Sequence, residues 1–198
     1  MSLTVREYID GIEFGTLFIA DDIDTESTYD SVKTQLCKAC AEGRIERVHH
    51  GVYYKPEYDP EIDRNIPYSK RELAYAIARM NDWRIIPDGD VCLNMLGLST
   101  QVPAKYVFLS DGPYKIYEID GKTIEFRHRA PKNYPKDEFS AMVVQAIKAQ
   151  TRDNCDRDFI NKLSRAIPVE RRNSLIENTS NTSAWIRNVI REACADGH

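Results

Sequence analysis

Apolar residues in the first third of the chain recur at the spacing of an α-helix. A helix is predicted from about residue 28 to residue 42, ending before Gly43, and its inward positions are Val32, Leu36, Ala39 and Cys40. A shorter helix is predicted over residues 5–12, because Thr4 and Glu7 have the spacing of a capping box. Between the two helices, the segment TLFIADDI (16–23) has room for a short second helix.

After Gly43 the pattern changes to that of two short strands, at residues 45–48 and 52–55. The connection between them is His-His-Gly, in which Gly51 can adopt a positive φ. A helix that leads directly into a small basic hairpin is the outline of a winged helix-turn-helix. This outline favours a role in binding DNA.

The rest of the chain predicts a second, mixed region. Residues 57–68 are charged and contain two prolines, which is typical of a linker. The elements expected after it are a helix over 70–80, a strand at 84–86, a helix over 90–96, three strands at 106–110, 115–119 and 122–129, and several helices beyond Pro135.

The prediction is therefore an α+β protein with a helical C-terminal tail. The three strands should form an antiparallel meander, since an Asp-Gly pair at 120–121 favours a hairpin turn. The expected divisions are a winged helix-turn-helix (1–56), a linker (57–68), an α+β domain (69–135) and a helical region (136–198).

Composition limits the function classes. The hydrophobic content of 42% suits a folded globular protein, and no apolar run approaches the roughly 18 residues that cross a bilayer. The start of the chain lacks an apolar signal core, and the five scattered cysteines suit reduced thiols, so we expect a cytoplasmic protein without a membrane partner.

Charge is distributed unevenly. The chain carries a net charge of −4, which argues against general binding to nucleic acid. Residues 1–27 contain one basic and seven acidic residues, whereas residues 28–55 contain five basic and three acidic ones. Positive charge is therefore local to the predicted helix and hairpin.

Polar and basic residues of this region are candidates for DNA contact. Helix residues of a winged helix reach base edges in the major groove, and hairpin residues hold phosphates or reach the minor groove. The candidates are Ser31, Thr34, Gln35 and Lys38 on the helix and Arg44, Arg47, His49 and His50 on the hairpin. The alternative is a solvated basic edge that serves protein contacts, because fold does not settle function.

Other chemistry is less well supported by the sequence. Cys37 and Cys40 with the two histidines have the residue types of a zinc site, but the two sulfurs diverge around the helix. Asp88 and Asp90 could hold Mg²⁺ for nucleotidyl transfer, but no glycine-rich phosphate loop precedes them. We therefore expect no enzyme activity, metal or cofactor.

The segment from Pro87 to Pro131 closely resembles the second domain of AbiEi-type antitoxins. Its most specific part is LGLSTQVP, which consists of Leu96, Gly97, Leu98, Ser99, Thr100, Gln101, Val102 and Pro103. The same family carries a winged helix ahead of this domain, with a glycine–basic stretch similar to Gly43–Tyr53. The resemblance covers about residues 1–132.

This resemblance implies an antitoxin of a bacterial type IV toxin–antitoxin system linked to abortive phage infection. Such a protein would repress its own operon by binding double-stranded promoter DNA. It would also counter a nucleotidyltransferase-like toxin, without a stable complex between the two proteins. The LGLSTQVP loop is either a structural crossover or a functional surface. A winged helix that binds only protein, and a nucleotide-handling enzyme that uses Asp88 and Asp90, are the alternatives.

Overall fold

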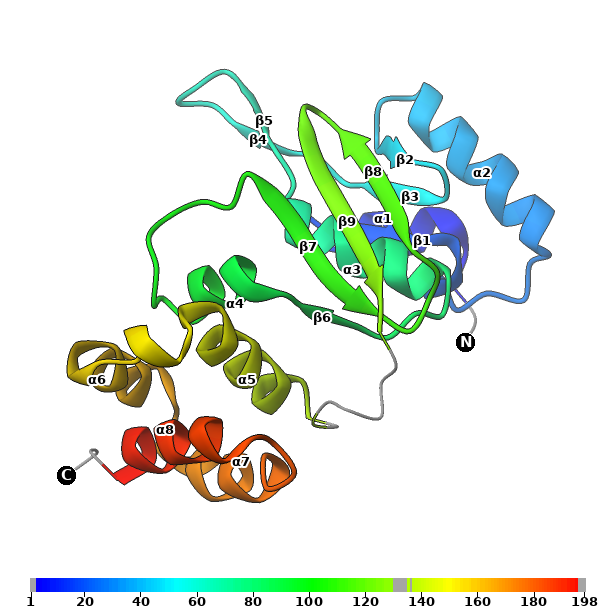
Figure 1. The fold of residues 1–198 in the computed structure, drawn as a ribbon. Helices are drawn as coiled ribbons and strands as arrows, with labels where there is room; N and C mark the ends of the chain where they lie inside the picture. The colour runs from blue at the N-terminus through cyan, green and yellow to red at the C-terminus, as the bar shows by residue number, and fades with distance from the viewer. Residues whose placement is uncertain (1–2, 130–134, 136, 196–198) are drawn as a thin grey trace. The chain divides into compact units, whose positions relative to one another are not determined.

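The computed structural model of the chain describes residues 3–129, 135 and 137–195. The protein is mixed α+β, with 48% helix and 20% strand. Its contacts divide the chain into two compact units, one ending at Trp83 and the other beginning at Arg84 (Figure 1). None of the helices within the described ranges has the length and apolar character to cross a membrane.

In its described residues, 3–83, the first unit contains three α-helices, a three-stranded sheet and a two-stranded sheet. Its elements are α1 (Val5–Gly11), β1 (Leu17–Ile19), the short 3₁₀ turn η1 (Ala20–Asp22), α2 (Tyr29–Ala41), β2 (Glu46–His49), β3 (Val52–Tyr54), β4 (Glu57–Asp59), β5 (Arg64–Ile66) and α3 (Lys70–Met80). In the three-stranded sheet, β3 lies between β1 and β2 and pairs antiparallel with both strands.

Both predicted helix starts of this region are capped. The Thr4 hydroxyl accepts a hydrogen bond from the Glu7 amide at 3.2 Å, and the Glu7 carboxylate accepts one from the Thr4 amide at 2.8 Å. At the start of α2, the Thr28 hydroxyl accepts from the Ser31 amide. The helix ends before Gly43, which has a φ of +71°. The helices and the β2–β3 hairpin are thus confirmed close to their predicted bounds.

The expected short helix at residues 16–23 is wrong. Leu17–Ile19 is strand β1, and only the three residues of η1 turn helically. Phe18 and Ile19, which are neighbours in sequence, are both buried, as happens in a strand covered on both faces. The Asp22 carboxylate accepts a hydrogen bond from the Ile19 amide at 3.0 Å, which fixes the turn that follows.

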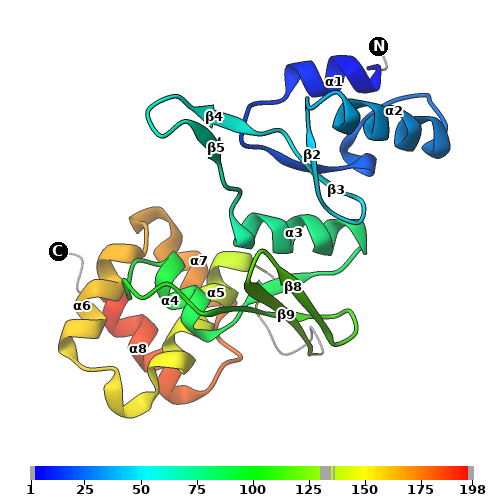
Figure 2. The same cartoon turned by 90° about the horizontal axis from the view of Figure 1, so that it is seen from above.

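Helices cover both faces of the three-stranded sheet (Figure 2). Phe18 and Tyr53 face α1 and α2 and share a core with Leu36 and Ile45. Val52 and Tyr54 point to the opposite face because side chains alternate along a strand, and α3 packs against β1 and β3 there. This explains why all three residues of β3 are buried.

The stretch expected to be a linker, residues 57–68, contains a regular hairpin instead of irregular chain. Strands β4 and β5 pair antiparallel, with Glu57 opposite Ile66. The Tyr54 hydroxyl donates to the Ile66 carbonyl at 2.7 Å and thereby fastens the base of this hairpin to the sheet.

The second unit contains a four-stranded sheet and a group of helices. Its elements are β6 (Ile85–Pro87), α4 (Gly89–Met95), β7 (Lys105–Ser110), β8 (Lys115–Ile119), β9 (Lys122–His128), α5 (Glu138–Gln150), η3 (Arg152–Asn154), α6 (Arg157–Ala166), η4 (Val169–Arg171), α7 (Arg172–Asn178) and α8 (Ala184–Ala195).

The predicted antiparallel meander is wrong in its strand order. The order is β6-β7-β9-β8, so β9 inserts between the two preceding strands and runs parallel to β7. Burial explains the order: Ile124, Glu125 and Phe126 of β9 are all buried, whereas β8 buries only Ile119 fully. The more apolar strand takes the central position and the more polar strand takes the edge.

The C-terminal helices do not form a separate tail. Residues of α4, α5, α6, α7 and α8 share one apolar core, which includes Cys92, Val143, Leu163, Leu175 and Ile190. Helix α4 and the helices after Pro135 are therefore parts of the same packed group. The last two residues of the AbiEi-like segment, 130–131, lie outside the described residues.

Candidate functional site

Helix α2 presents most of its candidate residues to solvent. Val32 and Leu36 are buried as predicted, which leaves Ser31, Thr34 and Lys38 exposed. Gln35 is half-buried at the flank. The predicted rotational phase of the helix is therefore confirmed.

The exposed polar groups of α2 bond to one another within the helix. The Gln35 amide donates to the Ser31 hydroxyl at 3.2 Å, and the Thr34 hydroxyl donates to the Asp30 carbonyl at 2.8 Å. Lys38 lies 3.9 Å from the Glu42 carboxylate. All of these bonds are exposed and local, so a ligand could replace them at little cost.

Two of the candidates on α2, Gln35 and Lys38, lie on the side of the helix that faces α1. A shallow cavity of about 160 Å³ lies between the two helices, and Arg6, Gln35, Lys38 and Arg44 are among the residues that line it. The β2–β3 hairpin lies on the opposite flank. The residues that the sequence predicted as one DNA-contact surface therefore lie on different sides of α2.

The flank of α2 beside the hairpin carries residues that were not among the DNA contacts predicted from the sequence. Tyr29, Lys33 and Cys37 recur every four residues and form a stripe along this flank, with the Lys33 ammonium 5.7 Å from the Tyr29 ring centroid. Burial raises the pKa of Tyr53 on β3, and the charge of Arg47 opposes this shift, while Cys37 and Tyr29 add to it. The i, i+4 spacing was the available signal for this stripe.

Arg44 is held by the fold. Its guanidinium forms an ion pair with the Asp10 carboxylate of α1, and its side chain is only 27% exposed. Lys55, another basic residue of the 28–55 stretch, is buried and donates to the Ile12 carbonyl at 2.7 Å. Two of the five basic residues in this stretch therefore serve local structure.

Arg47 supplies the fixed positive charge of the β2–β3 hairpin. It is exposed on β2, directly before a bulge at Val48 that shifts the register between Arg47 and His49. Burial, with His50 and Arg47 nearby, lowers the pKa of His49 below its ordinary value, so His49 is uncharged at neutral pH. His50 is exposed at the turn.

The tip of the hairpin packs against the end of α3. Gly51 has a φ of +77°, and a Cβ placed on it would lie 2.5 Å from the Met80 sulfur. The tip is therefore supported from the side opposite α1 and α2 and requires glycine for two independent reasons.

Exposed acidic residues lie in the segment before α2 and in its first turn. Asp21, Asp24, Glu26 and Asp30 are exposed there. Asp22 is paired with Arg79 at 3.0 Å. The first turn of α2 therefore carries a negative field that opposes close approach of a phosphate backbone.

Neither alternative metal site gathers ligands. In the part of the chain that the structure describes, no three His, Cys, Asp or Glu side chains converge as a metal site. Burial raises the pKa of Asp88, whose carboxylate lies 3.5 Å from the Arg127 guanidinium, while Asp90 is exposed. Asp88 is thus engaged with an arginine of the neighbouring sheet.

The Leu96–Pro103 loop is anchored by its own hydrogen bonds. Gly97 has a φ of +67°, and the amides of Leu98 and Ser99 donate to the Leu93 carbonyl at 2.8 and 3.2 Å, which ends α4. The Asn94 side-chain amide donates to the carbonyls of Ser99 and Gln101 at 3.4 and 3.1 Å. These bonds account structurally for the first half of the motif.

The second half of this loop faces solvent. Thr100 and Gln101 are exposed, Val102 is 70% exposed, and Pro103 is buried again. A large apolar side chain thus projects from a loop whose base is fixed. Leu96 and Leu98 pack against the helical core and anchor the loop on that side.

Comparison with known proteins gives a family but no activity. None of the curated proteins matches the chain at a significant level. Residues 4–175, which cover most of the first unit and the second unit as far as residue 175, match the family model described as "Family of unknown function (DUF6088)". The chain therefore belongs to the DUF6088 family.

Proposed function

We propose that this protein is the antitoxin of a bacterial type IV toxin–antitoxin system and represses its own operon by binding promoter DNA. The observation that carries the proposal is the order of elements in the first unit, α1-β1-η1-α2-β2-β3, with a sheet in the order β1-β3-β2. This order supports the proposal because it is similar to that of a winged helix-turn-helix, with η1 in the place of the second helix.

In this proposal, α2 is the recognition helix and the β2–β3 hairpin is the wing. Ser31, Thr34 and Gln35 offer neutral hydrogen-bonding groups that suit base edges. Arg47 contacts a phosphate and contributes affinity without sequence preference. Lys33, on the flank beside the hairpin, adds a second phosphate contact that the sequence analysis did not include.

The acidic residues around the start of α2 set the expected strength of binding. They repel the phosphate backbone, so affinity rests on few cations and decreases as salt rises. We therefore expect the protein to recognise its operator with modest affinity.

The antitoxin role is assigned to the second unit. The AbiEi-like segment contains the Leu96–Pro103 loop, whose exposed part, Thr100 to Val102, is held on a fixed base. The functional partner is a nucleotidyltransferase-like toxin encoded next to this protein. We propose that the chain counters the toxin's effect in the cytoplasm and has no enzyme activity or cofactor of its own.

Co-expression with the adjacent reading frame tests the antitoxin role. If that frame encodes a nucleotidyltransferase-like toxin, its induction should arrest growth, and the full chain should restore growth. An Arg47→Ala variant should still restore growth while losing repression of a promoter reporter, because the two roles lie in different units. Persistent growth arrest in the presence of the folded wild-type chain would contradict the proposal.

A protein-binding winged helix is the second candidate. The exposed acidic residues at the start of α2 favour it, because they suit a basic protein surface better than DNA. A partner recovered by pull-down, together with the same affinity for operator and random duplex, would favour this candidate over the repressor.

A further inference from the structure

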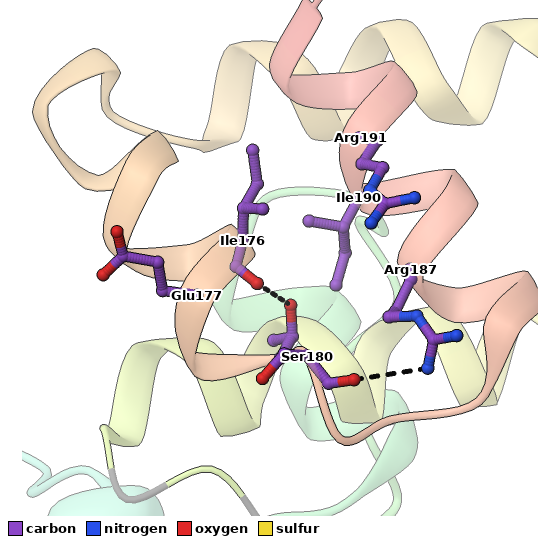
Figure 3. Close-up of a pocket in the computed structure, with 7 residues that line it drawn as sticks. Ile176, Glu177, Ser180, Arg187, Ile190 and Arg191 are labelled. Atoms are coloured by element: carbon purple, nitrogen blue, oxygen red, sulfur yellow. Dashed lines mark hydrogen bonds between the residues drawn. The ribbon is translucent and has the colours of Figure 1, made fainter.

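Helices α7 and α8 enclose a pocket that the proposed DNA-binding and antitoxin roles do not use. Its volume is about 410 Å³, within the range of small-molecule sites (Figure 3). Its lining includes Ile176, Thr179, Ser180, Arg187, Ile190 and Arg191. All of these residues follow residue 175, where the match to the DUF6088 family ends.

The pocket has an apolar part and a cationic part. Ile176 of α7 and Ile190 of α8 supply aliphatic surface, and Ile190 is only 1% exposed. Arg187 and Arg191 are four residues apart and therefore lie on the same side of α8, where Figure 3 shows both side chains.

One of the two arginines is fixed by the protein, and the other is available. The Arg187 guanidinium donates to the carbonyls of Thr182 and, at 3.3 Å, Ser180 in the turn before α8. These bonds use one nitrogen of the guanidinium and leave other N–H groups for a ligand. Arg191 is exposed and forms no hydrogen bond or ion pair with any residue in the described ranges.

The one acidic residue lining this pocket, Glu177, does not neutralise the arginines. Its carboxylate is directed to the far side of α7, away from Arg187 and Arg191 (Figure 3). Ser180 also lines the pocket and carries a hydroxyl group, which is a neutral hydrogen-bond donor. The pocket therefore joins two positive charges to an apolar wall.

We propose that this pocket binds a small phosphate monoester that carries a compact apolar or aromatic group. Two guanidinium groups match a phosphate monoester, which is close to a dianion at neutral pH, and their planar donors bind its oxygens in pairs. The aliphatic wall of Ile176 and Ile190 receives the apolar group.

Titration of the full-length protein with phenyl phosphate, followed by ¹⁵N–¹H NMR, tests the site. We expect saturable shifts confined to residues 176–191 and to the side-chain N–H of Arg187 and Arg191. Inorganic phosphate and benzoate should bind at least about fivefold more weakly, since each lacks one feature that the pocket recognises. Equal binding of either probe, or shifts spread over the basic surface, would overturn the proposal.

Matched arginine variants distinguish binding at this pocket from general attraction of the anion by positive charge. Arg191→Gln should weaken phenyl phosphate binding about tenfold without lowering the melting temperature, because its side chain has no partner to lose. Arg165→Gln on α6 makes the same charge change on an exposed position outside the pocket and should leave binding unchanged. Equal losses in both variants would contradict a defined site. Neither measurement involves DNA, so the outcome does not depend on whether the protein is a repressor.

Discussion

At the scale of single residues, the fold gives arginines that look equivalent in the sequence different roles. Arg44 and Arg47 lie three positions apart and both entered the predicted DNA surface. Arg44 is paired with Asp10, whereas Arg47 is exposed on β2. The residues next to Arg44 and Arg47 do not predict this difference, because Asp10, the partner of Arg44, is 34 residues away from it in the sequence.

Substitution of Arg47 should change DNA binding and leave stability unchanged. Arg47→Ala should weaken binding to operator and random duplex alike, by roughly threefold to tenfold, and reduce the slope of log K against log salt by about 1, with an unchanged melting temperature. Thr34→Ala or Gln35→Ala should instead relax sequence preference. Fluorescence anisotropy titrations at several salt concentrations provide the measurement, and exchanged effects would refute the assigned roles.

Gly51 and Gly43 offer a second matched pair. Both have positive φ, but a Cβ on Gly51 would meet the Met80 sulfur, whereas a Cβ on Gly43 meets nothing within 4 Å. We expect Gly43→Ala to cost about 1 kcal/mol from backbone strain and Gly51→Ala about 2–3 kcal/mol. In a Met80→Ala background the two costs should converge in urea denaturation. A difference that persists there would show that the tip does not pack on α3 in this way.

At the scale of elements, periodicity and caps predicted most helices and the β2–β3 hairpin well. These features depend on neighbouring residues, such as Thr4 with Glu7. The misassigned elements depend on distant partners. β1 is a strand because β3 pairs with it, and β9 is central because its burial exceeds that of β8. Because the three strands follow one another in the sequence, a meander was the simplest predicted order. The observed order instead places the more buried strand, β9, in the centre.

The candidate site, like the fold, was predictable from the sequence only where it depends on neighbouring residues. The outward phase of α2 followed from its apolar positions and is confirmed. The cavity toward α1 and the support of the hairpin by Met80 required contacts between elements. The stripe of Tyr29, Lys33 and Cys37 follows the i, i+4 spacing of a helix face. It contains only one positive charge, so the distribution of charge along the sequence did not indicate it as a binding surface.

The motif loop yields a prediction at this scale. Asn94→Ala removes the side-chain donor to the Ser99 and Gln101 carbonyls, so it should cost about 1 kcal/mol and speed amide exchange across residues 97–102. Thr100→Ala alters an exposed side chain of the same loop and should leave the stability and the amide exchange rates unchanged. Native-state hydrogen exchange checks this, and unchanged protection in Asn94→Ala would show that the loop is held by other contacts.

At the scale of the whole molecule, charge and the two-unit fold determine what the protein can do. The net charge of −4 and the acidic residues near α2 argue against indiscriminate binding to nucleic acid. In the proposed repressor role, binding then depends on a particular sequence that contacts α2. In the proposed account, the first unit controls expression and the second unit, with its AbiEi-like segment, counters the toxin.

The most direct test of this account is the affinity of the full chain for its own upstream DNA, compared with a random duplex of equal length at about 150 mM salt. The account predicts at least 100-fold tighter binding to the upstream region, with the difference retained as salt is raised. Equal affinity for the two duplexes would contradict the repressor role.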